Sequence, residues 1–133
     1  MTALITAESD AAPEGRDFDI AFVALGYEPR CRWVWSTAEV AATHKLAVEF
    51  GFLQQGAYAE NREFLEQRAF QFLIGVGEHA VPSIVGVISD LVLPDNGPIT
   101  VLIDISAMSR EMIANVLLAL NHVLCGRQVI ISS

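Results

Sequence analysis

Long apolar runs, signal sequences and clustered metal ligands are all missing from this sequence. No apolar run in its 133 residues approaches the roughly 18 residues that a membrane-spanning helix needs. The N-terminus has neither a basic start nor a long apolar core, so it is not a secretory signal peptide. Two cysteines, Cys31 and Cys125, and three scattered histidines show no metal or redox spacing. We therefore expect a reduced, cytoplasmic protein without a metal site.

Basic residues are also scarce. Eight Lys and Arg residues face sixteen Asp and Glu residues, which gives a net charge of −8. Binding along a nucleic-acid backbone needs a basic face, so we expect neither duplex nucleic acid nor a membrane as partner. Three of the eight cations, Arg30, Arg32 and Arg110, nevertheless fall in two loops that stand out for other reasons. That placement favours a small anionic ligand, with chance as the alternative.

Motifs of the common enzyme classes are missing too. Gly26 stands alone rather than in a G-x-G-x-x-G loop, and the sequence has no Walker loop. It also has no Ser/Cys–His–Asp set. Nicotinamide redox chemistry, NTP hydrolysis and proteolysis are therefore not expected, and no cofactor is predicted.

The composition indicates one domain with more apolar surface than usual. Hydrophobic residues make up 53% of the chain and charged residues only 18%. Residues 1–17 read as a flexible acidic leader, and residues 18–133 as a single α/β domain. The apolar excess, and a last strand with no helix after it, predict a homodimer or a domain of a longer protein.

Apolar stretches of strand length alternate with helical patterns along the chain. Five buried strands are predicted, at 19–25, 46–52, 70–76, 99–103 and 128–132. Four helices are predicted between them: 29–43, a short helix capped by Asn61, 82–93, and one with apolar residues from Ile113 to Leu124. This alternation predicts a three-layer, Rossmann-like α/β domain with a five-stranded parallel sheet. We expect the strand order 3-2-1-4-5, with the flavodoxin-like order 2-1-3-4-5 as the alternative.

Two polar loops, 26–32 and 104–110, follow the first and fourth of these strands. In the order 3-2-1-4-5 they meet at the carboxyl edge of the sheet, where its direction reverses and ligands bind in open α/β sheets. The start of the helix after the second loop suits an anion, because free N–H groups and the positive end of the helix dipole lie there. The candidate ligand-binding residues are Tyr27, Arg30, Arg32, Asp104, Ser106, Ser109 and Arg110.

Structural roles are the alternative for several of these residues. Asp104 can cap the next turn or pair with Arg30, and both serines are ordinary helix-capping types. Glu28 can pair with a neighbouring arginine instead of acting as an acid. Arg110 is poorly placed for the helix dipole, so a purely structural explanation suits it less well.

Residues 104–112, Asp-Ile-Ser-Ala-Met-Ser-Arg-Glu-Met, resemble the strand-to-helix motif of CRISPR-associated Rossmann-fold (CARF) sensor domains. In that motif an Asp and a Thr or Ser end the strand, and two Gly, a Thr or Ser, a Lys and a Met follow. Asp104, Ser106, Ser109 and Met112 match, and Arg110 replaces the Lys. Ala107 and Met108 stand where the glycines would be. The resemblance implies a homodimeric sensor of oligoadenylates in bacterial antiviral defence, acting on a fused or associated effector.

Three functions remain open at this stage. The first is a sensor domain that binds a nucleotide or a nucleotide second messenger through arginines and backbone N–H groups. The second is an enzyme that cleaves an N-glycosidic bond, as TIR-like NAD hydrolases and nucleoside deoxyribosyltransferases do. In this enzyme Glu28 or Asp104 is the candidate catalytic residue, which stabilises or attacks an oxocarbenium-like transition state. The third is a protein interaction domain. Fold class alone does not separate them.

Overall fold

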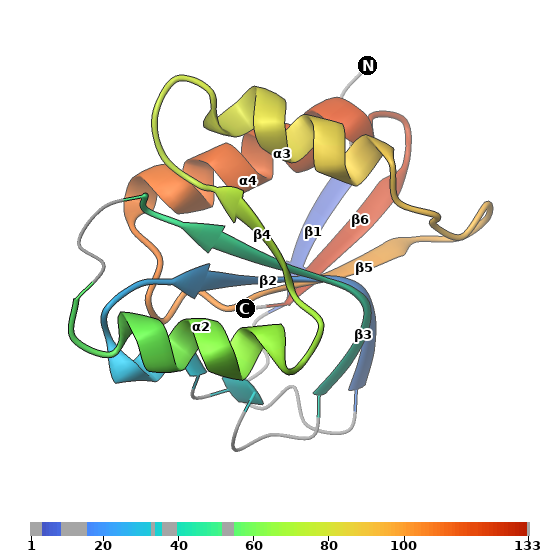
Figure 1. The fold of residues 1–133 in the computed structure, drawn as a ribbon. Helices are drawn as coiled ribbons and strands as arrows, with labels where there is room; N and C mark the ends of the chain where they lie inside the picture. The colour runs from blue at the N-terminus through green and yellow to red at the C-terminus, as the bar shows by residue number, and fades with distance from the viewer. Residues whose placement is uncertain (1–3, 9–15, 33, 36–39, 52–54, 133) are drawn as a thin grey trace.

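A computed structural model describes residues 4–8, 16–32, 34–35, 40–51 and 55–132. These residues include six strands, the helices α2, α3 and α4, one short 3-10 helix, and a helical stretch at 34–35 (Figure 1). The strands are β1 (Leu4–Glu8), β2 (Arg16–Leu25), β3 (Val40–Glu49), β4 (Gln71–Ile74), β5 (Ile99–Ile103) and β6 (Gln128–Ser132). The helices are η1 (Pro29–Arg32, 3-10), α2 (Tyr58–Glu66), α3 (Ala80–Ser89) and α4 (Arg110–Val123).

All strand pairs are parallel, and the sheet runs in the order β1-β6-β5-β2-β3-β4. The five strands predicted from the sequence therefore lie in the order 3-2-1-4-5, which confirms the Rossmann-like α/β fold. The flavodoxin-like alternative is wrong, because β2 pairs with both β3 and β5.

The sixth strand, β1, lies inside the segment that was predicted to be a flexible leader. Leu4 to Glu8 pair in register with Gln128 to Ser132 of β6. In addition, β2 begins at Arg16. The leader prediction therefore fails for these residues, because the edge of β6 offers backbone partners that local composition does not reveal.

One face of the sheet carries the main core. The inward side chains of β2, β5 and β6 pack there against α3 and α4, whose buried residues include Ile84, Ile88, Val116 and Leu120. In α4 the buried positions Met112, Val116, Ala119 and Leu120 are spaced three or four residues apart, as an amphipathic helix requires. Figure 1 shows these two helices together on one side and α2 on the other.

The opposite face has a smaller core under α2. Val23, Leu25 and Ala47 contact Leu65 of α2 and the buried Phe70. Trp35, which follows β2 in the sequence, packs against this smaller core, whereas α4, which follows β5, packs on the other face of the sheet. The predicted reversal point lies between β2 and β5.

The predicted helix over 29–43 is confirmed only in part: residues 34–35 are helical as well as the first turn, residues 33 and 36–39 lie outside the described residues, and the last part of the predicted helix is strand. Pro29 does start a helical turn, but η1 ends at Arg32, and Val40 already belongs to β3. The early start of β3 follows from the length of β2, since Arg16 to Phe18 pair with Val40 to Ala42. Cross-strand pairing here overrides the helical preference of the alanines.

Other predicted boundaries shift by a few residues. The third strand covers Gln71–Ile74 instead of 70–76, and α3 ends at Ser89 instead of Leu93. Asn61 does not cap α2, because it lies inside that helix with a fully buried side chain. No helix in the described part of the chain is long and apolar enough to cross a membrane.

Candidate functional site

The loops after β2 and β5 leave neighbouring strands at the same edge of the sheet. Phe22 of β2 is in register with Ile103 of β5, and the Asp104 N–H extends this pairing by donating to the Phe22 carbonyl at 2.9 Å. The predicted adjacency of the two loops is therefore confirmed. In open α/β sheets the ligand-binding crevice forms at this topological position, which in this protein is the space between the two loops (the crevice).

Asp104 is the most unusual side chain at this edge. It is 6% exposed, and its Oδ1 accepts two bonds, from Ser106 Oγ at 2.6 Å and from the Ser106 N–H at 3.2 Å. Its Oδ2 is buried and has no hydrogen-bond partner among the described residues. Burial raises the pKa of Asp104, and the bonds from Ser106 only partly oppose this. The predicted pairing of Asp104 with Arg30 is not observed.

Ser109 caps α4, and its predicted structural role is confirmed. Its Oγ accepts from the Met112 N–H at 3.2 Å, and its carbonyl accepts from the Ile113 N–H. The N–H groups of Arg110 and Glu111 have no recorded acceptor in the described part of the chain. The first turn of α4 therefore still presents free donors at the crevice.

The two charged residues at the start of α4 differ. The Glu111 carboxylate accepts from the Gly77 N–H at 2.8 Å and so anchors the loop after β4. Asn115 holds the same loop through the Gly75 carbonyl at 3.0 Å. Arg110 is exposed and makes no ion pair with any described residue. Among the described residues of the two loops, its guanidinium is the cation without an ion-pair partner.

The loop after β2 is held rigidly by α2 and the residues before it. Asn61 Nδ2 donates to the carbonyls of Gly26 at 2.9 Å and Glu28 at 2.8 Å. Between them, the Tyr27 carbonyl accepts from the Ala57 N–H at 2.9 Å. Tyr27 itself is 44% exposed. The sequence did not reveal this role of Asn61, although a polar residue in the middle of an apolar helix face was a signal.

The remaining predicted cations are already paired. Arg30 forms an ion pair with Glu28, as the structural alternative predicted. Both side chains are well exposed, so the pair contributes little to stability. Arg32 reaches Glu60 of α2 at 3.5 Å. Arg30 can exchange its partner for a ligand, whereas Arg32 points to α2.

Cys31 is buried under this loop. Burial raises the pKa of its thiol, although backbone N–H groups of Gly26 and Glu28 act in the opposite direction. The charges of Glu28 and Asp104 raise it further. A raised pKa does not suit a nucleophilic thiol.

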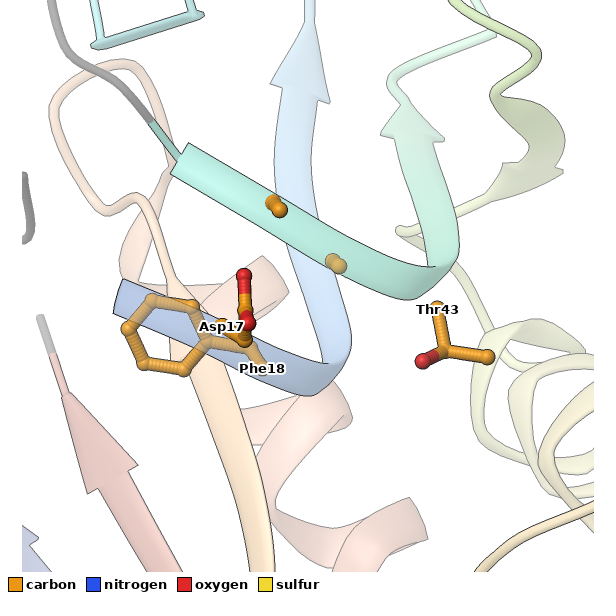
Figure 2. Close-up of a pocket in the computed structure, with 5 residues that line it drawn as sticks. Asp17, Phe18 and Thr43 are labelled. Carbon is orange, nitrogen blue, oxygen red and sulfur yellow. The ribbon is translucent and has the colours of Figure 1, made fainter. Parts of the chain in front are cut away.

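Two hollows that are lined by described residues lie away from this edge. One, of about 250 Å³, is lined by Asp17, Phe18, Ala41, Ala42 and Thr43, near the amino ends of β2 and β3 (Figure 2). A second lies beside it and includes His44, whose Nε2 bonds to the Val92 carbonyl at 2.8 Å. Neither contains a predicted site residue. Both lie at the amino ends of the strands, so we place no ligand there.

No group of three His, Cys, Asp or Glu side chains in the described residues could hold a metal ion.

Comparison with known proteins finds no relative of this chain. No family model matches it, and the searches of curated proteins and solved structures return no significant match. The fold is Rossmann-like on its strand order alone.

Proposed function

We propose that the protein binds a phosphate-bearing nucleotide at the crevice between the β2 and β5 loops. The observation that carries the proposal is the free Arg110 at the start of α4, beside the free N–H groups of Arg110 and Glu111. A phosphate there would accept charge-assisted hydrogen bonds and interact favourably with the helix dipole. The crevice lies at the reversal point of the sheet, where this fold class places its ligands.

The acidic groups of the site do not oppose a phosphate as strongly as their number suggests. Glu28 is paired with Arg30, and the carboxylate of Glu111 faces the Gly77 N–H. Burial raises the pKa of Asp104, so the site favours the neutral form of this carboxyl more than water does. Arg30 is exposed enough to turn from Glu28 to a ligand.

The test is calorimetric titration with AMP and ADP. Arg110→Ala removes the free guanidinium and is expected to weaken binding about ten- to a hundredfold, the usual loss for a charge-assisted contact. Arg30→Ala should weaken it less, because Arg30 must first leave Glu28. Arg127→Ala is the matched control, since Arg127 donates to the Gly97 carbonyl in another part of the fold. Equal affinities for the Arg110 and Arg127 variants would contradict the proposal.

A more specific version is a sensor of nucleotide second messengers. It rests on the resemblance of residues 104–112 to the CARF motif. Ala107 and Met108, which replace the glycines of that motif, pack against the core, and this keeps their side chains out of the crevice. Tighter binding of short oligoadenylates than of AMP, together with sedimentation as a dimer, would support this version; preference for AMP would contradict it.

An enzyme that cleaves an N-glycosidic bond is the second candidate. Asp104 favours it, because a buried carboxyl with a raised pKa and an unpaired oxygen suits a general acid. Chromatography of the titration mixtures for released base or nicotinamide decides between the two. If Glu28 were the catalytic group instead, Glu28→Gln would abolish turnover and leave affinity nearly unchanged. If no nucleotide binds, a protein interaction domain becomes the better hypothesis.

A further inference from the structure

The loop after β2 combines a fixed backbone with an exposed aromatic ring. The carbonyls of Gly26, Tyr27 and Glu28 each accept a hydrogen bond of 2.8–2.9 Å from Asn61 or Ala57. Asn61 is fully buried and cannot move without disrupting α2. Gly56 also passes close by, since a Cβ placed on it would lie 3.0 Å from the Tyr27 carbonyl oxygen. Tyr27 is therefore anchored on both sides.

The ring of Tyr27 is left in solvent although its backbone is fixed. Five large apolar side chains are exposed in the described part of the chain, and Tyr27 is the only aromatic one: Tyr27, Ile74, Val92, Ile105 and Leu118. Exposure of an aromatic ring gives up the stabilisation that burial would provide. A rigid support lowers the entropic cost of binding something against it.

The position of Tyr27 relates it to the proposed phosphate site. It follows β2 directly, whereas Arg110 follows the loop of β5, the neighbouring strand. We infer that Tyr27 is the platform on which the heteroaromatic base of the ligand stacks while Arg110 holds its phosphate. The inference rests on the proposed function and deepens it: the ligand is a nucleotide and not a simple sugar phosphate, and a purine binds better than a pyrimidine because it covers more of the ring.

The test compares AMP, UMP and ribose 5-phosphate by calorimetry, because the last of these carries the phosphate without a base. Wild type should bind AMP more tightly than UMP, and UMP more tightly than ribose 5-phosphate. Tyr27→Ala should weaken AMP binding about five- to a hundredfold, the range for loss of a stacked base, and leave ribose 5-phosphate unchanged. Tyr27→Phe keeps the stacking face and should retain the affinity for AMP.

Ile105→Ala is the matched control. Ile105 is exposed to 47%, much like Tyr27, and follows the neighbouring strand, but it has no ring. Its loss should leave the preference for AMP intact. Equal binding of AMP and ribose 5-phosphate by wild type would overturn the inference and leave the phosphate site standing. If Ile105→Ala weakened AMP binding as much as Tyr27→Ala, the inference would also be overturned. If none of the three compounds binds, the proposed function and the inference fail together.

Discussion

Replacing Asp104 with Asn should stabilise the protein at neutral pH. Asp104 is 6% exposed, and its Oδ2 has no partner among the described residues, so ionisation places a charge where only Ser106 solvates it. Asparagine keeps an oxygen to accept the two bonds from Ser106 and carries no charge. Leaving a buried polar group unsatisfied costs about 1–3 kcal/mol, and more when the group is charged. Because the new amide N–H₂ is also unsatisfied, we expect a net gain of about 1 kcal/mol.

The gain should depend on pH in a defined direction. The pKa of Asp104 is raised above its ordinary value of 3.8, so the folded protein keeps this proton at pH values where the unfolded chain has lost it. The stability of wild type should therefore fall as the pH rises from 3.8 through the folded-state pKa. The Asn variant lacks this loss, so its advantage should be absent in acid and complete at neutral pH.

Thermal unfolding between pH 4 and pH 8 measures the effect. One kcal/mol corresponds to about 3–5 °C in Tm for a domain of this size. Asp95→Asn, in the exposed turn before β5, is the control and should change stability by less than about 0.5 kcal/mol at any pH. An advantage for Asp104→Asn that is the same at every pH would show that folding does not raise the pKa of Asp104. A loss of stability at pH 8 would show that Asp104 is charged and well paired. Either result would refute the reasoning.

Two further predictions concern helix ends and glycines. Ser109→Ala should lower the free energy of unfolding by about 1 kcal/mol because it removes the cap bond to the Met112 N–H, whereas Ser109→Asp should retain most of the stability in urea titration. Gly86→Ala should stabilise α3 by about 0.5–1 kcal/mol, since a Cβ there meets nothing within 4 Å. Gly75→Ala should instead cost about 1–3 kcal/mol, because its Cβ would lie 2.8 Å from that of Val48; similar stability for the two glycine variants would contradict this.

The strand order could be predicted because it depends on long-range features of the sequence. The apolar runs of β2 and β5 are buried on both sides, and such strands occupy the centre of parallel sheets. Once β2 and β5 are central, the right-handed crossover rule leaves few arrangements for the remaining strands. The placement of the two polar loops at one edge follows directly.

The errors arise where a distant partner decides the local structure. β1 exists because β6 offers it a free edge, and β3 begins early because β2 is long. Asn61 was predicted to be a helix cap, a role set by its immediate neighbours. In the structure its partners are the carbonyls of Gly26 and Glu28, more than thirty positions away in the sequence. Spacing along the chain carries no information on such a contact.

At the site, the residue types predicted local capping and ion pairing better than they predicted hydrogen bonds to distant residues. The sequence correctly suggested that Ser109 caps α4 and that Glu28 pairs with an arginine. It did not show that the carboxylate of Glu111 holds the loop at Gly77, or that one oxygen of Asp104 is left without a partner. The first depends on the path of the loop after β4, and the second on the burial of Asp104.

The pairing of β1 with β6 has a consequence for synthesis on the ribosome. Leu4 is in register with Gln128, so the two strands are 124 positions apart, more than the 81 positions between Ile20 and Val101. The extra loop-closure cost is small, about 0.4 kcal/mol, since it grows only with the logarithm of length. The time that passes between the synthesis of the two strands has the greater effect. At about 5–20 residues per second, β1 waits roughly 6–25 seconds until β6 has been made. Of the six strands described, the one that is synthesised earliest must therefore wait for the one that is synthesised latest.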